Sequence, residues 1–304
     1  KVGICGTDLH AYAGNQAYFE YPKILGHELA SEVIDIGEND KCIKIGDKVV
    51  VMPYISCGVC FACNKGKTNC CENITVLGVH ADGGLQEQIS VPVELLLPAN
   101  HLSDDQIAIV EPLAIGAHAI RRSGIESDET VAVVGCGPIG IGIIKLAQIA
   151  SANVIALDMN LQRLNYAKDK IGADHVVNVG GNALREVTEI TNGDLCSIVF
   201  DASGNKNALE TCPDYMSNGG KFVLVGLSKG ELTYSHPKVH AKEMTLLCSR
   251  NASQEDFEHV MTILDQFPTS SFITHNVPFI KMIEHFDSWL DPTTGVIKAT
   301  VNFK

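Results

Sequence analysis

Four cysteines gather in one loop of this 304-residue chain with a spacing typical of a metal site. The pattern is Cys-x2-Cys-x2-Cys-x7-Cys, within a stretch rich in glycine, asparagine and lysine. Four thiolates complete the tetrahedral shell of a zinc ion and leave no position for substrate, so we expect a structural site. Free or disulfide-bonded cysteines are the alternative, and spacing alone does not choose between Cys70 and its neighbour as the last ligand. The predicted ligands are Cys57, Cys60, Cys63 and Cys71.

A second group of possible ligands is scattered over the first thirty residues. Cys5 stands in Gly-Ile-Cys-Gly-Thr-Asp-Leu-His, and His27 and Glu28 follow Gly26. A thiolate, an imidazole and a carboxylate are suitable ligands for a catalytic zinc that keeps one position open. Taken singly, a His-Glu pair more often forms a solvated face or a packed core histidine.

A glycine fingerprint follows one β-branched run and precedes a run with helical periodicity. It reads G-x-G-x-x-G, the pattern in which a tight turn brings a pyrophosphate to the backbone at a helix N-terminus. Glycines mark many turns, so a purely structural turn is the alternative. The residues of the fingerprint are Gly135, Gly137, Pro138, Ile139 and Gly140.

An acidic residue, Asp158, ends the next β-branched run. A carboxylate there can accept hydrogen bonds from both ribose hydroxyls of adenosine and would repel a 2′-phosphate, so NAD is favoured over NADP. Arg163 lies shortly afterwards and weakens this preference, because an arginine can pair with that phosphate.

These fingerprint residues sit in a long alternation of short β-branched runs and helical runs. Buried apolar strands separated by helices predict a parallel, doubly wound sheet with helices on both faces. We expect helices at 138–150, 161–171, 184–191 and 205–217, and strands at 130–135, 153–158, 175–179, 195–201, 221–226 and 245–249.

The first 120 residues are different, because glycine and proline interrupt them at short intervals. They predict an irregular β domain built on loops. After Arg250 we expect a helix capped by Ser253 and a return of the chain to the first domain. The expected strands are 30–36, 48–53, 86–91, 95–97, 277–280 and 295–303, and the expected helix is 253–266.

Composition excludes several classes of protein. The chain has 23 Lys and Arg against 36 Asp and Glu, a formal net charge of −13. Such a surface repels phosphate backbones and anionic lipids, so we expect neither nucleic acid nor a membrane as partner. The apolar stretch 131–150 contains four glycines, a proline and a lysine, so a strand, turn and helix explain it better than a membrane span.

Taken in order, these motifs resemble the zinc-containing medium-chain dehydrogenase/reductase family, the zinc-type alcohol dehydrogenases. The resemblance covers essentially the whole chain and includes the pair Glu111–Pro112. Within the family the chain is similar to the sorbitol and threonine dehydrogenase branch, and there to the L-galactonate oxidoreductase and starvation-sensing dehydrogenase-like group. That finer likeness rests on Gly14–Asn15–Gln16, on residues 77–84 and on residues 249–252.

The resemblance implies an α/β fold with a GroES-like β catalytic domain and a doubly wound Rossmann domain. The catalytic domain covers 1–121, the NAD-binding domain 122–250, and 251–304 returns to the catalytic domain. Relatives carry a few tens of residues before the motif around Cys5, so we expect the chain to be N-terminally incomplete.

The resemblance also assigns roles to residues. Cys5, His27 and Glu28 become ligands of a catalytic zinc, and Glu111 binds that zinc directly or through water. Thr7 and His10 take the positions of a proton relay from the substrate hydroxyl, a role that suits histidine near neutral pH. An exposed acid at a turn before Pro112 is the alternative for Glu111.

The expected activity is a hydride transfer between a secondary alcohol of a polyol or sugar acid, L-galactonate-like, and NAD. We expect two zinc ions per chain, one catalytic and one structural, a cytoplasmic location and a homo-oligomer, dimer or tetramer. For a sugar acid, His80 and Arg250 are candidates to meet the carboxylate. The alternative is a non-catalytic sensor that holds zinc and NAD, or a sugar acid, without turnover.

Overall fold

The computed structural model describes residues 1–15 and 19–303, and Gln16 lies outside the described residues. The chain divides into two compact units. The first is formed by Lys1–Ala114 together with Asn251–Lys304, and the second by Ile115–Arg250. The change from the first unit to the second falls inside helix α4 (Val110–Ser123), and the return falls after Arg250.

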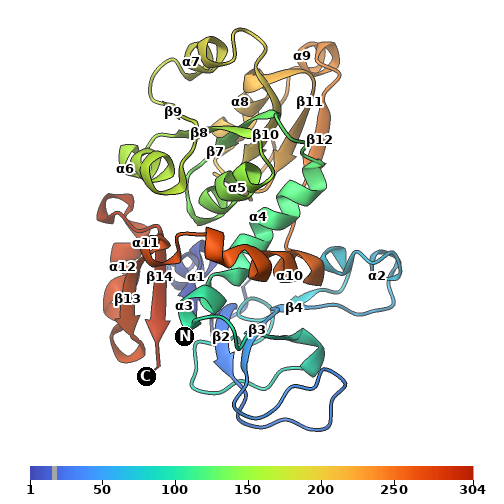
Figure 1. The fold of residues 1–304 in the computed structure, drawn as a ribbon, viewed down its shortest axis with the longest axis vertical. Coiled ribbons are helices and arrows are strands. Elements are labelled where there is room, and N and C mark those ends of the chain that lie inside the picture. Colours follow the sequence, from blue (N-terminus) through green and yellow to red (C-terminus); the bar gives the residue numbers. More distant parts are fainter. Residues whose placement is uncertain (16–18, 304) are drawn as a thin grey trace. The chain divides into compact units, whose positions relative to one another are not determined.

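The second unit contains the predicted parallel sheet (Figure 1). Its six strands have the order β12-β11-β10-β7-β8-β9, and every neighbouring pair is parallel. The order reverses beside β7, the strand that precedes the glycine fingerprint, which is where a doubly wound sheet binds its ligand. The strands are β7 (Thr130–Val134), β8 (Asn153–Asp158), β9 (His175–Asn178), β10 (Cys196–Asp201), β11 (Met216–Leu224) and β12 (Thr245–Cys248).

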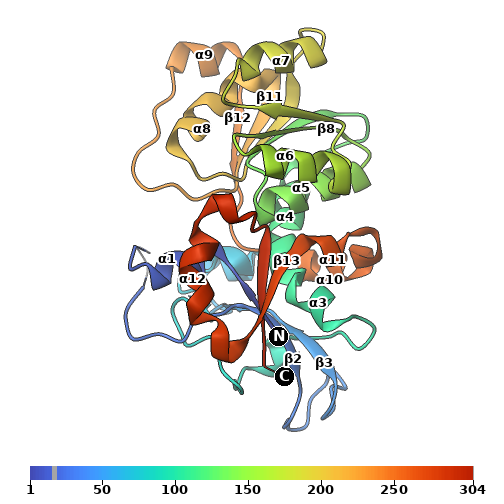
Figure 2. The same cartoon turned by 90° about the vertical axis from the view of Figure 1, so that its left-hand side faces the viewer.

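Helices cover both faces of this sheet because the central strands are apolar on both sides (Figure 2). The face formed by Ala132, Ile155 and Phe222 packs with α7 and α8, and α5 and α6 cover the opposite face. The helices are α5 (Pro138–Ile149), α6 (Leu161–Tyr166) with the π-helix η3 (Ala167–Ile171), α7 (Ala183–Ile190), α8 (Lys206–Thr211) with η4 (Cys212–Tyr215), and α9 (His236–Ala241).

The first unit is built on a second six-stranded sheet with the order β13-β14-β1-β2-β3-β6. Strands from both ends of the sequence meet in it, because β14 pairs with β1. A small two-stranded sheet, β4-β5, lies before and after the cysteine loop. The strands are β1 (Val2–Ile4), β2 (Glu28–Glu32), β3 (Lys48–Val51), β4 (Tyr54–Ile55), β5 (Thr75–Val76), β6 (Leu96–Pro98), β13 (Ile273–Pro278) and β14 (Lys298–Asn302).

The first unit is less purely β than the sequence predicts. The expected strand at 86–91 is wrong: this segment pairs with no strand of the described chain, and Ile89 and Val91 pack on the core from a loop. Several helices were not predicted, notably α1, α4 and α12. The helices of this unit are α1 (Gly6–Tyr12), α2 (Phe61–Asn64), α3 (Asp104–Ala108), α10 (Gln254–Ile263), α11 (Thr269–Phe272) and α12 (Ile283–Leu290), besides the start of α4; η1 (Thr68–Cys70), η2 (Val93–Leu95), η5 (Leu264–Gln266), η6 (Phe279–Lys281) and η7 (Pro292–Thr294) are short turns of 3-10 helix.

The apolar stretch at 131–150 forms strand β7, the fingerprint turn and helix α5, as expected. Among the described residues, none of the helices combines the length and the apolar character needed to cross a lipid bilayer.

Candidate metal centres and cofactor site

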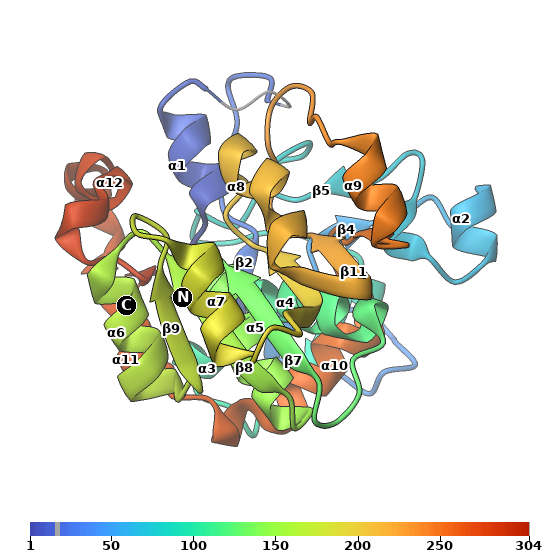
Figure 3. The ribbon, with the colours of Figure 1, turned by 90° about the horizontal axis from the view of Figure 1, so that it is seen from above.

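The four predicted cysteines of the loop come together in space. One ligand atom from each of Cys57, Cys60, Cys63 and Cys71 lies within 4.8 Å of the others. The loop carries the short helix α2 and extends away from the sheet of its own unit (Figure 3). Cys71 is buried in the group, whereas Cys70 is exposed. The structure therefore favours Cys71 as the fourth ligand, a choice that the spacing left open.

Backbone amides favour the thiolate at two of the four cysteines, Cys57 and Cys60, whereas burial raises the pKa of Cys63 to about 11. Hydrogen bonds from the backbone of Cys63 and Glu72 lower the pKa of Cys60 to about 6. Backbone hydrogen bonds from Val59 and Cys60 lower the pKa of Cys57, and the Cys57 amide donates to Cys71 Sγ at 3.2 Å. Thiolate is the form that binds metal, and four thiolates with N–H donors suit a closed zinc site.

The second predicted group also assembles. Ligand atoms of Cys5, His27 and Glu28 lie within 4.8 Å of one another. Cys5 follows β1 and forms the N-cap of α1, while His27 and Glu28 begin the neighbouring strand β2. Adjacent strand ends therefore bring residues distant in sequence to one point. Three ligands from rigid elements leave a tetrahedral metal one open position.

Asp8, which the sequence reasoning overlooked, connects the two segments that carry these ligands. Its side chain is fully buried. Asp8 Oδ2 accepts a hydrogen bond from the Cys5 amide at 2.9 Å, and Oδ1 accepts one from the Gly26 amide at 3.1 Å. The same Oδ1 lies 3.7 Å from His27 Nδ1. A carboxylate behind a ligating histidine fixes the ring orientation, so Asp8 fits the supporting role found at many metal sites.

The electrostatics of this group indicate that it is suited to a cation. Burial alone would lower the pKa of His27, but the charges of Asp8 and Cys5 outweigh it and the pKa is raised well above its usual value. Burial raises the pKa of Glu28 to about 7, and Lys298 only partly opposes this. His27 Nδ1 and both oxygens of Glu28 are buried with no hydrogen-bond partner among the described residues, and Oε2 lies in an ion pair with Lys298. A divalent cation would neutralise this excess of negative charge, so the residues fit zinc.

Glu111 lies in the first turn of α4 and is buried beside this group without joining it. Tyr54, a second residue that sequence reasoning overlooked, donates its hydroxyl to Glu111 Oε1. Burial and the Glu111 charge raise the pKa of Tyr54 well above its usual value, so the phenol stays a donor. Glu111 is thus anchored close enough for its charge to raise the pKa values of both His27 and Glu28.

The residues predicted for the proton relay and for substrate binding are exposed or half-buried. Thr7 is half-buried and His10 exposed, both on α1, where a spacing of three places them on one helix face. His80 is exposed, and its Nδ1 accepts a hydrogen bond from the Val76 amide at 3.0 Å. Arg250 is exposed at the end of the second unit.

The glycine fingerprint has the geometry of a phosphate-binding turn. Gly135 has a φ of +96°, which favours glycine, and a Cβ on Gly140 would overlap the Gly135 carbonyl. Gly137 is the N-cap of α5, and Pro138 begins that helix. The free amides and the positive dipole end of α5 therefore stand open to an anion at this turn.

Asp158 and Arg163 both lie beside this turn. Asp158 is buried, and its Oδ2 accepts a hydrogen bond from the Cys136 amide at 2.7 Å, inside the fingerprint. Its Oδ1 accepts one from the Asn160 amide at 2.8 Å. A Cβ built on Gly137 would be 4.0 Å from Arg163 Nη1, so the guanidinium stands where a pyrophosphate would approach.

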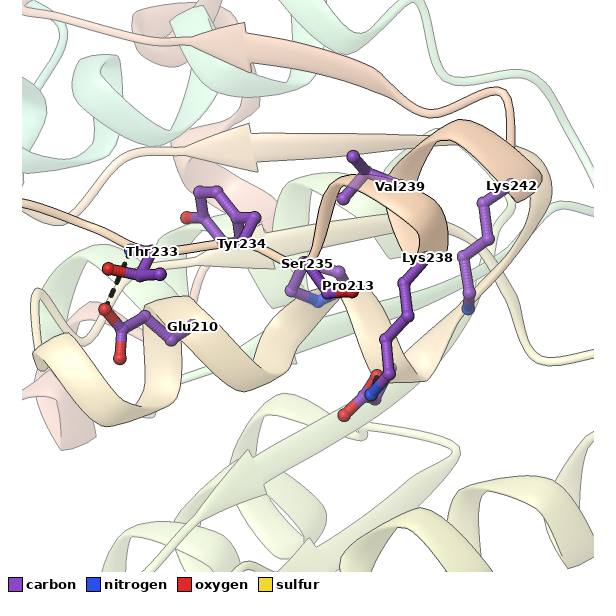
Figure 4. A pocket seen from close by; sticks show the side chains of 9 residues that line it. Glu210, Pro213, Thr233, Tyr234, Ser235, Lys238, Val239 and Lys242 are labelled. Atoms are coloured by element: carbon purple, nitrogen blue, oxygen red, sulfur yellow. Dashed lines mark hydrogen bonds and ion pairs between the residues drawn. The ribbon is translucent and has the colours of Figure 1, made fainter.

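A separate small cavity in the second unit contains none of the predicted residues. It has a volume of about 80 Å³, and Figure 4 shows its lining between α8 and α9. Its charged groups already have partners: Glu210 Oε1 accepts from the Thr233 amide at 2.9 Å, and Lys238 Nζ lies 3.5 Å from Asp214. Nothing in it offers metal or hydride chemistry.

The two units and the candidate sites define a class of protein, a zinc-binding, nicotinamide-dependent dehydrogenase. Residues 1–101 match the alcohol dehydrogenase GroES-like domain, and residues 138–266 match the zinc-binding dehydrogenase family. The chain belongs to the zinc-type alcohol dehydrogenase family, and it is a zinc-dependent alcohol or polyol dehydrogenase. The predicted family and fold class are therefore confirmed.

Relatives and a solved structure show how far the similarity extends. The L-galactonate-5-dehydrogenase of Escherichia coli K12 is 40% identical over all of this chain and 90% of its own length. The sorbitol dehydrogenase of Bacillus subtilis 168 is 34% identical over 81% of this chain and 71% of its own. The alcohol dehydrogenase rspB of Escherichia coli CFT073, solved with NADH, has a TM-score of 0.92 at 29% identity, over 99% of this chain and 89% of its own.

The contacts of Asp158 predict how the cofactor preference responds to mutation. Asp158→Asn keeps an oxygen for the Cys136 amide but removes the charge that would repel a 2′-phosphate. We expect the preference for NAD over NADP, measured as the ratio of kcat/KM values, to narrow by about tenfold or more, roughly 1.4 kcal/mol. Asp194→Ala, an exposed acid in the same unit, is the control and should leave the ratio unchanged. An unmutated enzyme that already used both cofactors equally would show that Asp158 has no such role.

Proposed function

We propose that this chain oxidises a secondary alcohol of a polyol or sugar acid, L-galactonate-like, with NAD as the hydride acceptor. The observation that carries the proposal is the group formed by half-buried Cys5 with buried His27 and Glu28, whose three ligands and excess negative charge suit a metal with an open position. Relatives named for L-galactonate and sorbitol support the substrate class, and the NADH in the rspB structure supports the cofactor.

Two zinc ions per chain complete the proposal. Cys5, His27 and Glu28 would hold the catalytic one, with Glu111 beside them, and the cysteine loop would hold the structural one. When bound, the catalytic zinc supplies a Lewis acid that makes a substrate hydroxyl more acidic, and the nicotinamide supplies the hydride acceptor.

The protein moves the proton and orients the reactants. Thr7 is two residues beyond Cys5, so its Oγ1 can accept the proton of a substrate hydroxyl, and His10 on the same helix face can pass it to solvent. The first turn of α5 would hold the pyrophosphate, Asp158 the ribose hydroxyls and Arg163 a phosphate charge. These contacts would hold the cofactor in a fixed orientation.

Recognition of a sugar-acid carboxylate would use cationic or donor side chains. Because His80 Nδ1 accepts from a backbone amide, its ring proton lies on Nε2, which makes that nitrogen a donor. Arg250 offers a permanent charge in a geometry that matches a carboxylate. Both therefore remain candidates for this contact.

The assembly and location are also part of the proposal. Strand β12 pairs with β11 alone in the described chain, and its Leu246 is 45% exposed, so the sheet offers an edge to a second copy in a homo-oligomer. We place the enzyme in the cytoplasm, because a reducing compartment keeps the metal-binding cysteines as thiols.

Turnover tests the proposed activity. The zinc-replete protein with NAD should reduce the cofactor when L-galactonate is added, and more slowly or not at all with other aldonates, sorbitol and threonine. Absorbance of the reduced nicotinamide follows the reaction. Binding of NAD and of a sugar acid without turnover, across the whole panel, would favour the sensor alternative and contradict this proposal.

Zinc content tests the two metal sites. The unmutated chain should contain two zinc ions by elemental analysis, and Cys63→Ser and Cys5→Ser should each lose one. Cys63→Ser should also lower thermal stability, since the metal holds a loop with little core of its own, whereas Cys5→Ser should keep the fold and lose activity. Cys70→Ser, next to the cluster but exposed, should retain both ions. One zinc in the intact, metal-replete protein would contradict the two-site proposal.

Removal of one hydroxyl tests the relay. Thr7→Val keeps the shape of the side chain and should lower kcat about 10²–10⁴-fold with little change in NAD affinity. His10→Ala should cost less, because water can replace an exposed relay member, and its rate should recover as pH rises. Thr188→Val on α7, another helical threonine, is the control. Near-normal kcat in Thr7→Val would show that the proton leaves by another route.

A further inference from the structure

A buried lysine lies at the proposed metal site, although no motif in the sequence points to it. Lys298 is on β14 and has a side-chain exposure of 1%. Its Nζ donates a hydrogen bond to the Ile4 carbonyl at 3.1 Å and forms an ion pair with Glu28 Oε2. An ammonium is rarely placed in a protein interior without a partner, and Glu28 is that partner.

Lys298 and Glu28 lie on two strands that are separated by a third, β1, and they meet over Gly3 of that strand. In the sheet, β1 lies between β14 and β2, and Gly3 of β1 is directly opposite both Glu28 and Thr300. Lys298 is two residues before Thr300 and so projects from the same face of the sheet. A Cβ at position 3 would overlap Glu28 Oε2. The absence of a side chain on Gly3 is therefore what lets the lysine and the carboxylate meet.

The pair divides the two oxygens of Glu28 between two roles. Neither oxygen has a hydrogen-bond partner among the described residues, but Oε2 forms the ion pair with Lys298 and Oε1 forms none. Cys5, which directly follows the strand that contains Gly3, lies with Glu28 in the proposed metal group. Oε1 is thus the oxygen left for a metal, and Lys298 balances one of the negative charges that surround it.

We propose that Lys298 and Gly3 are positioning residues for the metal site, which hold Glu28 so that a single oxygen is presented to the metal. This inference rests on the proposed assignment of Cys5, His27 and Glu28 as metal ligands. Neither residue touches the substrate in this proposal, and both act through the Glu28 carboxylate.

Cobalt(II) substituted for zinc in the full chain reports on the geometry of the site, because its visible absorption depends on the number and arrangement of its ligands. In Lys298→Met the Glu28 carboxylate loses the ion pair at Oε2 and is free to turn. We expect the cobalt spectrum to change and the cobalt affinity, from competition with a chelator, to fall about 10–100-fold. Lys298→Arg, which keeps the charge and the donors, should restore much of both.

Gly3→Ala provides a second variant with Lys298 intact. Its added methyl group would displace Oε2 and should change the same cobalt band, so the test survives if Lys298→Met fails to fold. Thr300→Val is the matched control: Thr300 is buried on the same face of β14 and bonds to Asn276, not to Glu28. It should keep the spectrum and the affinity of the unmutated chain.

The outcomes distinguish a failure of the positioning role from a failure of the proposed metal site itself. A folded Lys298→Met or Gly3→Ala protein with the spectrum and cobalt affinity of the unmutated chain would overturn the positioning role. If instead the unmutated chain, with its cysteine loop loaded, bound no cobalt at a second site, the assignment of Cys5, His27 and Glu28 would itself be wrong.

Discussion

The negative charge gathered around Cys5, His27 and Glu28 is the constraint on which the proposed metal site depends. The half-buried thiol of Cys5 lies near two buried carboxyl groups, those of Glu28 and Glu111, and among the described residues Lys298 forms an ion pair with Glu28. Such a group is costly to bury unless a cation joins it. Asp8 holds together the two segments that carry Cys5 and His27, so the protein itself arranges the candidate metal site.

The cofactor half depends on a different constraint, close approach of backbone. A side chain on Gly135 or Gly140 would collide with neighbouring backbone, and the resulting turn opens the N-terminus of α5 to a phosphate. Asp158 supports the turn through the Cys136 amide and also carries the charge expected to select the cofactor. In the proposal, Asp158 would therefore serve both the shape of the turn and the choice of cofactor, and an isosteric amide at this position separates the two roles.

The sequence predicts well those features whose signal is local. The cysteine spacing, the glycine fingerprint and the β-branched runs of the parallel sheet lie within short windows, and the strands at 153–158 and 245–248 are placed nearly to the residue. Lys298 and Tyr54 could not be found this way, because each meets its partner only after distant segments pair. Asp8 was visible inside the Cys5 motif, yet its contact with Gly26 depends on the fold. The segment 86–91 was wrongly predicted as a strand because its apolar residues, Ile89 and Val91, alternate with polar ones. Such residues can pack against a core from a loop as well as from a strand.

Anomalous diffraction from crystals of the active, metal-replete protein, recorded on both sides of the zinc absorption edge, tests whether a second zinc lies beside Cys5. We expect two zinc peaks per chain, one enclosed by the four cysteines of the loop and one contacted by Cys5, His27 and a single oxygen of Glu28. A protein that turns over its substrate with a zinc peak in the loop alone, and none beside Cys5, would contradict it.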